Sequence, residues 1–253
     1  MKITLLLVLG IVVGLGCLIP DAGYREDIEI LIVKEPVKRH PYQEEYEQML
    51  YPVVRITSSS GTGSGVILDV TKVTTVTRVT GCCTPSPESV RGTCGHASLS
   101  FILTACHVVD NENTVNIELY NATIITGTVV ITDTIKDLAL IRPSGQVSYS
   151  AQLAPRKYTP YLFTPVWAMG CSLGLTPRPS QGIISAIKTD HWEITAPILP
   201  GNSGGPIYDA RTYQVIGIAV WVKVYDGQLI TTMAGIVPIN QIYEFLKPQM
   251  HTD

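Results

Sequence analysis

From residue 51 onward, short runs of apolar and β-branched residues are interrupted by Gly, Pro and Asp, a pattern typical of strands joined by turns. A loop with four prolines, from Pro143 to Pro165, divides these runs into two groups. The strands expected before the loop are Val53–Thr57, Gly65–Val70, Lys72–Thr80, Leu99–Ala105, Val115–Tyr120, Ile124–Ile131 and Leu138–Arg142. The strands expected after it are Val166–Cys171, Gln181–Thr189, Trp192–Ala196, Gly205–Tyr208, Val215–Val222 and Ile230–Pro238. Six or seven strands on each side of a loop predict two β-domains, as barrels or sandwiches.

Two helices are expected outside these strands. Tyr42–Leu50 follows Pro41, which is tolerated at a helix start. Near the C-terminus, Asn240 is a suitable N-cap for a helix that ends at Lys247 and carries an apolar stripe. The expected organisation is 1–20 as a signal peptide or membrane anchor, 21–50 as a charged surface arm, 51–145 as the first β-barrel, 146–165 as a linker, and 166–253 as the second β-barrel with the closing helix.

Residues 3–19 form an uncharged apolar run directly after Lys2. The run is slightly long for the apolar part of a signal peptide and slightly short for a bilayer-spanning helix. We expect it to direct export, which leaves the chain secreted, periplasmic or tethered to a membrane; a buried N-terminal core helix is the alternative. A cleaved signal, an uncleaved anchor and a lipid-modified Cys17 all stay open.

Composition narrows the classes of function. Of the 253 residues, 45% are hydrophobic and 15% are charged, which excludes an intrinsically disordered chain. The 18 Lys and Arg residues against 21 Asp and Glu residues leave a net charge of −3. This balance argues against nucleic-acid binding through bulk charge.

Three polar positions stand out, although each has a structural explanation of its own. The glycines of Gly201–Pro206 can expose the Ser203 hydroxyl and direct backbone N–H groups to one point, but such a segment is also a good turn. His107 ends an apolar strand, where a hydrogen-bonded core histidine is the common case. Asp137 precedes another apolar run and is by itself typical of a turn.

Taken together, the three positions indicate nucleophilic catalysis. A serine hydroxyl is a weak nucleophile until an imidazole accepts its proton, and the imidazole needs a carboxylate on its other nitrogen to fix its tautomer. The chain supplies the three groups in the order His107, Asp137, Ser203, with the serine in the second group of strands. This is the chain order of chymotrypsin.

Five stretches, which cover roughly residues 51–247, then resemble the trypsin/chymotrypsin-fold serine proteases in the same order. The similarity is greatest to the HtrA/Deg and glutamyl-endopeptidase-like bacterial branches. The matching stretches are Val53–Ile56 with Gly63–Leu68, Thr104–Val109, Asp137–Ile141, Gly170–Gly174 with Gln181–Ser185, and Gly201–Pro206 with Val215–Ile218. The resemblance implies an all-β chymotrypsin fold of two six-stranded antiparallel β-barrels with a short C-terminal helix.

The resemblance also implies a serine endopeptidase that acts on polypeptides and needs no cofactor, metal or nucleic acid. Ser203 would be acylated, His107 would act as general base and then acid, and Asp137 would orient the imidazole. The amides of Gly201 and Ser203 would form the oxyanion hole. The oligomeric state is left open.

The sequence gives less information about which substrate residue precedes the cleaved bond. The substrate-binding residues that the resemblance implies are Pro197, Ile198, Ala219, Val220 and Trp221. Because the segment before the nucleophile carries no charge, cleavage after Lys or Arg is disfavoured, and we expect a small or medium apolar residue before the scissile bond. The alternative is that the indole closes the pocket. Only six residues follow Lys247, so we expect no appended PDZ domain.

The cysteines have mostly structural interpretations. Cys82, Cys83 and Cys94 lie with His96 in an insertion, residues 81–98. In an exported protein we expect Cys94 to form a disulfide with Cys82 or Cys83, and zinc binding is the alternative.

The remaining candidate side chains are also expected to be structural. Cys106 is expected on a strand, pointing away from the neighbouring histidine, and both it and Cys171 are expected to be small buried residues. The expected surface histidines are His40, His191 and His251, and the tryptophans expected to pack the barrels are Trp167 and Trp192.

One rival function belongs to a different class. A catalytically silent homologue could hold an extended peptide along the strand Ala219–Trp221 as a binding or chaperone module. The presence of the histidine, aspartate and serine argues against it. A blocked substrate pocket or a distorted oxyanion loop would favour it.

Overall fold

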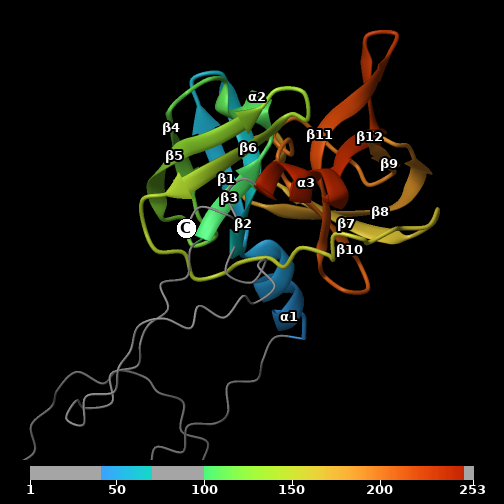
Figure 1. The fold of residues 1–253 in the computed structure, drawn as a ribbon, viewed down its shortest axis with the longest axis horizontal. Coiled ribbons are helices and arrows are strands. Elements are labelled where there is room, and N and C mark those ends of the chain that lie inside the picture. Colours follow the sequence, from blue (N-terminus) through green and yellow to red (C-terminus); the bar gives the residue numbers. More distant parts are fainter. Residues whose placement is uncertain (1–40, 70–99, 248–253) are drawn as a thin grey trace, which may run out of the picture. The chain divides into compact units, whose positions relative to one another are not determined.

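The computed structural model describes residues 41–69 and 100–247, and in these residues the strands form two closed six-stranded barrels (Figure 1). The first barrel contains β1 (Val53–Ser58), β2 (Gly61–Asp69), β3 (Ser100–Thr104), β4 (Thr114–Glu118), β5 (Ile124–Asp133) and β6 (Leu138–Pro143). The second contains β7 (Pro165–Gly170), β8 (Arg178–Ile187), β9 (Trp192–Ile194), β10 (Pro206–Asp209), β11 (Val215–Tyr225) and β12 (Gln228–Pro238). The expected strand 72–80 and the insertion 81–98 lie outside the described residues.

Every strand pairing in the first barrel is antiparallel, in the order β1-β2-β3-β6-β5-β4, and β1 closes the barrel against β4. The burial of the side chains differs between the strands of this barrel. In β4, Val115 and Ile117 face the core while their neighbours Thr114 and Asn116 are exposed. Because successive side chains of a strand point to opposite faces, this pattern turns one face of β4 to the core and the other to water, whereas β2, β3 and β6 are buried on both faces.

The second barrel has the order β10-β11-β12-β9-β8-β7 and is followed by helix α3 (Ile239–Leu246). The apolar face of α3 contacts β11 and β12. The helix begins at Ile239 with Pro238 as its N-cap, so the expectation that Asn240 caps it is wrong. Strand β12 runs directly into the helix through Pro238, whose restricted φ suits a helix start, and Asn240 therefore already lies inside the helix.

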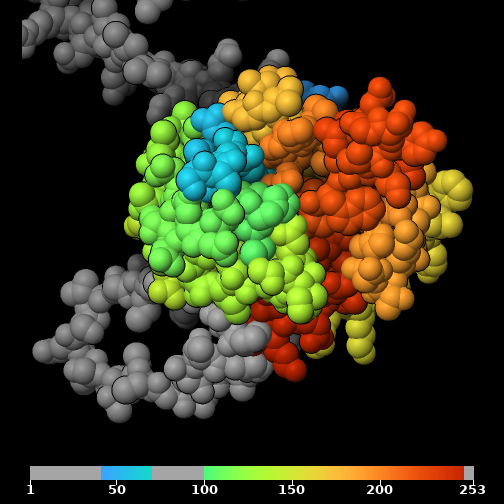
Figure 2. All heavy atoms as spheres, turned by 90° about the horizontal axis from the view of Figure 1, so that it is seen from above, coloured from blue at the N-terminus to red at the C-terminus, as the bar shows by residue number. Residues whose placement is uncertain are grey.

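The two barrels lie side by side (Figure 2) and share one cluster of buried side chains. This cluster includes Val53 and Leu103 from the first barrel and Ala168 and Ile218 from the second. Because apolar surface is buried continuously from one barrel to the other, the hydrophobic effect stabilises their association as well as each barrel.

At the N-terminal side of the first barrel, α1 (Gln43–Glu45) and the π-helical turn η1 (Tyr46–Leu50) form the expected short helix before β1. The apolar run 3–19 lies outside the described residues. In the ranges 41–69 and 100–247, no helix is long and apolar enough to cross a bilayer.

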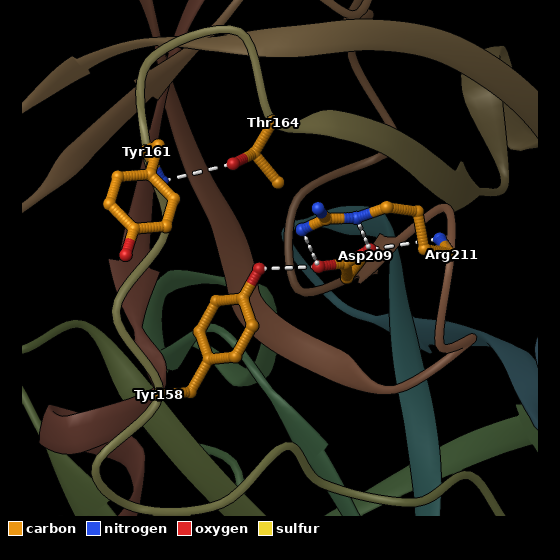
Figure 3. Close-up of polar contacts among 5 residues, drawn as sticks. All are labelled: Tyr158, Tyr161, Thr164, Asp209 and Arg211. Carbon is orange, nitrogen blue, oxygen red and sulfur yellow. Dashed lines mark hydrogen bonds and ion pairs between the residues drawn. The ribbon is translucent and has the colours of Figure 1, made fainter.

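A hydrogen bond from Tyr158 to Asp209 of β10 fixes the linker between the barrels against the second barrel (Figure 3). The Asp209 carboxylate is buried and accepts hydrogen bonds from the Tyr158 hydroxyl at 2.6 Å and from Nη2 of Arg211 at 2.9 Å. Burial alone would raise the pKa of Asp209, but the hydrogen bonds from Arg211 and Tyr158 outweigh it and hold the pKa below its usual range. The linker is fixed further by Thr164, whose hydroxyl accepts a hydrogen bond from the Tyr161 amide at 3.0 Å.

Candidate active site

His107 lies in α2 (Cys106–Val109), a single helical turn that directly follows β3. Its ring nitrogen Nδ1 is 2.7 Å from Oδ2 of Asp137, and its backbone N–H donates to Oδ1 of the same carboxylate at 2.9 Å. Both carboxylate oxygens are therefore engaged by one residue. This double contact fixes the position of the imidazole relative to the carboxylate.

The barrel topology explains why these two side chains meet. Strands β3 and β6 are neighbours, with Thr104 opposite Ala139. In an antiparallel pair, the residues that follow one strand lie at the same edge as the residues that precede the other. His107 follows β3 and Asp137 precedes β6, so both lie at that edge. Asp137 has a φ of 54°, a left-handed conformation that Asp adopts more readily than most residues.

Asp137 also governs the proton affinity of the imidazole. The hydrogen bond to Asp137 raises the pKa of His107 above its ordinary value, partial burial acts in the opposite direction, and the negative charge of Asp137 adds to the increase. The His107 side chain remains 49% exposed, and with Asp137 it lines an open cavity of about 220 Å³. A substrate can therefore reach the imidazole.

The Ser203 turn depends on glycine at two positions. Gly201 has a φ of 95° and Gly204 a φ of 81°, values that residues with a Cβ rarely adopt. A Cβ on Gly204 would overlap the Ser64 carbonyl oxygen and the Thr104 hydroxyl. The turn is thus close-packed against the first barrel.

Backbone and side-chain hydrogen bonds hold the turn there. The Ser64 amide of β2 donates to the Ser203 carbonyl at 2.8 Å, and the Thr104 hydroxyl donates to the Ser64 carbonyl at 2.6 Å. Thr104 ends β3, three residues before His107. The nucleophile turn of one barrel is therefore fixed against the strand end of the other barrel that leads to His107.

The side chain of Ser64 adds a contact that the sequence analysis missed. The fully buried hydroxyl donates to the Gly201 carbonyl at 2.6 Å and accepts from the Cys171 amide at 2.8 Å. It therefore links β2 to two loops of the second barrel. The only signal in the sequence is a serine between two glycines, Gly63 and Gly65, which by itself indicates nothing more than a tight strand.

In the part of the chain that the structure describes, the proposed nucleophile makes no hydrogen bond to the imidazole, and the two proposed oxyanion donors are free. In the described residues, Ser203 Oγ makes no hydrogen bond to His107, and the amides of Gly201 and Ser203 donate no hydrogen bond. Catalytic hydrogen bonds are often long in proteins without substrate. Both amides are thus available to an oxygen of a bound molecule.

The predicted substrate-binding residues differ in their surroundings. Ile198 is buried in the core of the second barrel, whereas Pro197 in the same loop is exposed. On β11, Ala219 is buried and bonded to the Ser203 turn, since its carbonyl accepts from the Gly204 amide at 2.8 Å. Trp221 is 38% exposed.

Several minor expectations can be checked as well. Cys106 is buried as expected, but it lies in helix α2 beside His107, so its expected place on a strand is wrong: the chain turns into a helix at Ala105. Cys171 is buried too. The His191 side chain is partly exposed, at 20%, and lies beside Asp190.

Trp192 and Trp167 pack against the core as expected. Within residues 41–69 and 100–247 no group of His, Cys, Asp and Glu could hold a metal ion. The cysteines of the insertion, His40 and His251 lie outside these ranges.

Comparisons with known proteins agree with the resemblance to serine proteases that the sequence shows. A sequence profile described as a trypsin-like peptidase domain matches residues 89–218. The chain is 28% identical over 237 residues to "Putative serine protease HhoA" of Synechocystis, which covers 87% of this chain and 52% of that protein. It is 32% identical over 165 residues to "Serine protease Do-like HtrB" of Bacillus subtilis, which covers 56% of this chain and 34% of that protein. The chain thus spans about half, or less, of the length of these relatives.

Among solved structures, the fold is similar to that of the serine endoprotease from Yersinia pestis, with a TM-score of 0.62. The sequence identity is 20%, and the match covers 85% of this chain and 68% of that one. At this level of identity the likeness concerns the fold, and it confirms the expected chymotrypsin fold of two barrels.

Proposed function

This chain belongs to the trypsin-like peptidase family, and on that premise we propose that it is a serine endopeptidase with Ser203 as its nucleophile. The observation that carries the proposal is the double contact between His107 and Asp137. With Nδ1 held by the carboxylate, the other ring nitrogen, Nε2, is the one left to exchange a proton with substrate and nucleophile.

The reaction follows from these positions. As Ser203 Oγ attacks the peptide carbonyl carbon, His107 Nε2 accepts the hydroxyl proton, and the carbonyl oxygen becomes an oxyanion. His107 then gives the proton to the amine as the C–N bond breaks, which leaves an ester on Ser203. A water molecule attacks the ester while His107 takes its proton, and Ser203 regains a proton as the acid leaves.

The oxyanion is assigned to the free amides of Gly201 and Ser203. In enzymes where one such donor has been removed, the activation free energy of the reaction rises by about 3 kcal/mol. The bond from Ser64 to the Gly201 carbonyl, at 2.6 Å, supports the role because it fixes the peptide group next to the proposed donors.

Polypeptide substrates fit the edge of β11. Beyond Ala219, which is bonded to Gly204 and Gly205 of the turn, β11 no longer pairs with β10. An extended peptide can add to this edge as an antiparallel strand, with its backbone beside Ser203. We further propose export through residues 3–19, on the strength of their uncharged apolar sequence.

The test is covalent labelling of purified residues 21–253 with a fluorophosphonate probe, mapped by peptide mass spectrometry. We expect an adduct on Ser203 that is lost in Ser203→Ala and strongly reduced in His107→Ala, because the hydroxyl reacts only when the imidazole removes its proton. Exposed Ser60 lies on a turn of the first barrel and serves as the matched control position, so Ser60→Ala should label like the unaltered protein.

A folded protein that does not react would contradict the proposal. It would favour the silent peptide-binding module, which the missing hydrogen bond between Ser203 and His107 also allows. Binding of an extended peptide without cleavage would then identify that rival function.

A further inference from the structure

A groove lies between the helical segment before β1 and the second barrel, and none of its lining residues belongs to the proposed catalytic set. Its volume is about 500 Å³, within the range of about 300–1,000 Å³ that is usual for ligand pockets. One side comes from α1 and η1, which are blue in Figure 1, and the other side comes from β7, β8 and the loop after β10. The groove is therefore large enough for several side chains of a partner.

Aromatic and methionine side chains make up most of this groove. Four aromatic residues line it, two from the helical segment and two from the second barrel: Tyr42, Tyr46, Trp167 and Tyr213. All four are at least partly exposed, so a bound molecule can reach their rings. Met49 and Met169 also line the groove and are almost fully buried. Because methionine is unbranched and flexible, such a surface adapts to the shape of an apolar partner.

Glu45 places a negative charge among these rings. The Tyr213 hydroxyl donates to its Oε1 at 3.2 Å, while its other oxygen, Oε2, accepts no hydrogen bond from the described residues. No described residue that lines the groove is basic, and residues 43–50 contain three glutamates and no Lys or Arg. Arg211, in the same loop as Tyr213, is bonded to Asp209 instead (Figure 3). The groove thus holds a carboxylate without a cation.

Aromatic rings beside a carboxylate are suitable surroundings for a cation on an apolar stem. The face of an aromatic ring attracts a positive charge, and a guanidinium also stacks on rings and forms strong hydrogen bonds to a carboxylate. The methylene groups of an arginine would contact the methionines. A purely apolar occupant would bury Oε2 of Glu45 without a partner, which costs free energy, and an acidic occupant would be repelled. The chemistry of the groove therefore selects arginine with apolar neighbours.

Strand β7 connects this groove to the nucleophile turn. Met169 lines the groove, and a Cβ on Gly205 would overlap the Met169 carbonyl oxygen, so the backbone of β7 packs against the turn two residues after Ser203. A molecule bound in the groove is consequently held beside that turn. Polypeptides are the molecules on which the proposed activity acts, and they can present an arginine between apolar side chains.

We propose that this groove is a second binding site, separate from the proposed catalytic residues, and that it takes an arginine of a polypeptide together with its apolar neighbours. The inference rests on the proposed function only for the choice of a polypeptide as the partner. Glu45 binds the guanidinium, Trp167 and the three tyrosines surround it, and the methionines contact the neighbouring apolar side chains.

The test measures binding of a fluorescent peptide with the sequence Gly-Leu-Arg-Leu-Gly, blocked at both ends, to the full chain carrying Ser203→Ala, which prevents cleavage. A second peptide has citrulline, the neutral counterpart of arginine, at the centre. We expect the arginine peptide to bind about tenfold more tightly, because only arginine brings a charge to Glu45 and the rings. Glu45→Gln keeps an acceptor for the Tyr213 hydroxyl and should remove this difference, and Trp167→Leu should weaken binding of the arginine peptide about tenfold.

Glu47→Gln is the matched control, since Glu47 is an exposed glutamate of the same helical segment that does not line the groove, and it should leave binding unchanged. Equal affinity for the two peptides, or an unchanged difference in Glu45→Gln, would overturn the site. Self-association of the protein that Trp167→Leu abolishes, without peptide binding, would overturn it as well and assign the groove to a second copy of the chain.

Fluorophosphonate labelling of Ser203 in the unaltered protein separates this inference from the proposed function. Labelling without peptide binding leaves the endopeptidase and rejects the groove as a peptide site. Arginine-dependent binding without labelling supports the groove and contradicts the endopeptidase.

Discussion

The Ser64 hydroxyl shows how much one small side chain can position. It is fully buried and bonds to the Gly201 carbonyl and the Cys171 amide, two backbone groups of the other barrel. A buried polar group that loses its partner keeps its desolvation cost, so such a bridge fixes geometry more strongly than its own strength suggests. Ser64 is therefore a positioning residue for the loop that carries the proposed oxyanion donors.

Ser64→Ala should lower the free energy of unfolding by about 1–3 kcal/mol, because it leaves the Gly201 carbonyl and the Cys171 amide unpaired. We also expect the fluorophosphonate labelling rate of Ser203 to fall about tenfold, with the pH dependence of labelling unchanged. Urea unfolding and timed labelling measure the two effects, with exposed Ser60→Ala as control. A labelling rate equal to that of the control would refute the positioning role.

Asp137→Asn should change the pH dependence itself. His107 must be neutral to accept a proton, so activity is lost as the pH falls through its pKa, which Asp137 raises above the ordinary value of about 6.5. The substitution should move the midpoint of the acid limb of kcat/KM to lower pH and reduce the rate about 10⁴-fold. Asp133→Asn removes a carboxylate from the same turn without touching His107 and should do neither. An unmoved midpoint in Asp137→Asn would exclude the proposed contact.

At the level of elements, the apolar pattern predicted the strands of both barrels and a helix at each end of the β-region. The prediction was least accurate at the boundaries of the strands and helices. The expected strand Val215–Val222 continues to Tyr225 in β11, because the β11–β12 hairpin projects beyond the barrel (Figure 1), where its strands pair with each other and need no buried face. The prediction that Asn240 caps the final helix was wrong because the helix already begins at Ile239, with Pro238 as its N-cap.

The hydrogen bonds at Asp209 make the linker part of the second barrel, and Asp209→Asn should weaken them. We expect the free energy of unfolding at pH 7 to fall by about 2–4 kcal/mol, since a buried carboxylate loses charge-assisted bonds from Arg211 and Tyr158. Because the folded pKa of Asp209 is lowered, its stabilisation is present above the unfolded pKa of about 4 and is lost as the pH falls through the folded value.

Urea denaturation at pH 7 and near pH 3 tests this dependence. The difference between the unaltered protein and Asp209→Asn should shrink at the lower pH. Asp226→Asn removes a carboxylate from an exposed hairpin turn and provides the control. A difference that stays the same at both pH values would argue that the charge of Asp209 is unimportant.

For the whole molecule, the sequence predicted a set of three residues, of which the structure brings His107 and Asp137 into contact, but it did not predict how the two barrels meet. His107 and Asp137 could be assigned to one barrel edge from chain order and strand neighbours. The contact of Ser64 with Ser203 has no periodic signature, because a single backbone hydrogen bond between distant segments depends on how two complete barrels pack. Ser64 acquires its positioning role only from that packing.

The shared core predicts that the barrels unfold together. All three tryptophans, Trp167, Trp192 and Trp221, belong to the second barrel, whereas Leu103 is buried in the first. Leu103→Ala should nevertheless lower the urea midpoint reported by tryptophan fluorescence, by an amount equivalent to about 2–5 kcal/mol, and far-UV circular dichroism should report the same midpoint. An unchanged fluorescence midpoint would show that the barrels unfold independently.

The buried cysteines make the motion of this junction measurable. Burial raises the pKa of Cys171 to about 11, and burial followed by the charge of Asp137 raises the pKa of Cys106. Alkylating reagents attack the thiolate, so at neutral pH both thiols should be inert until a fluctuation exposes them to water. Since the Cys171 amide is bonded to Ser64 across the two barrels, the rate at which Cys171 is alkylated under native conditions reports how often the barrels part beside the Ser203 turn.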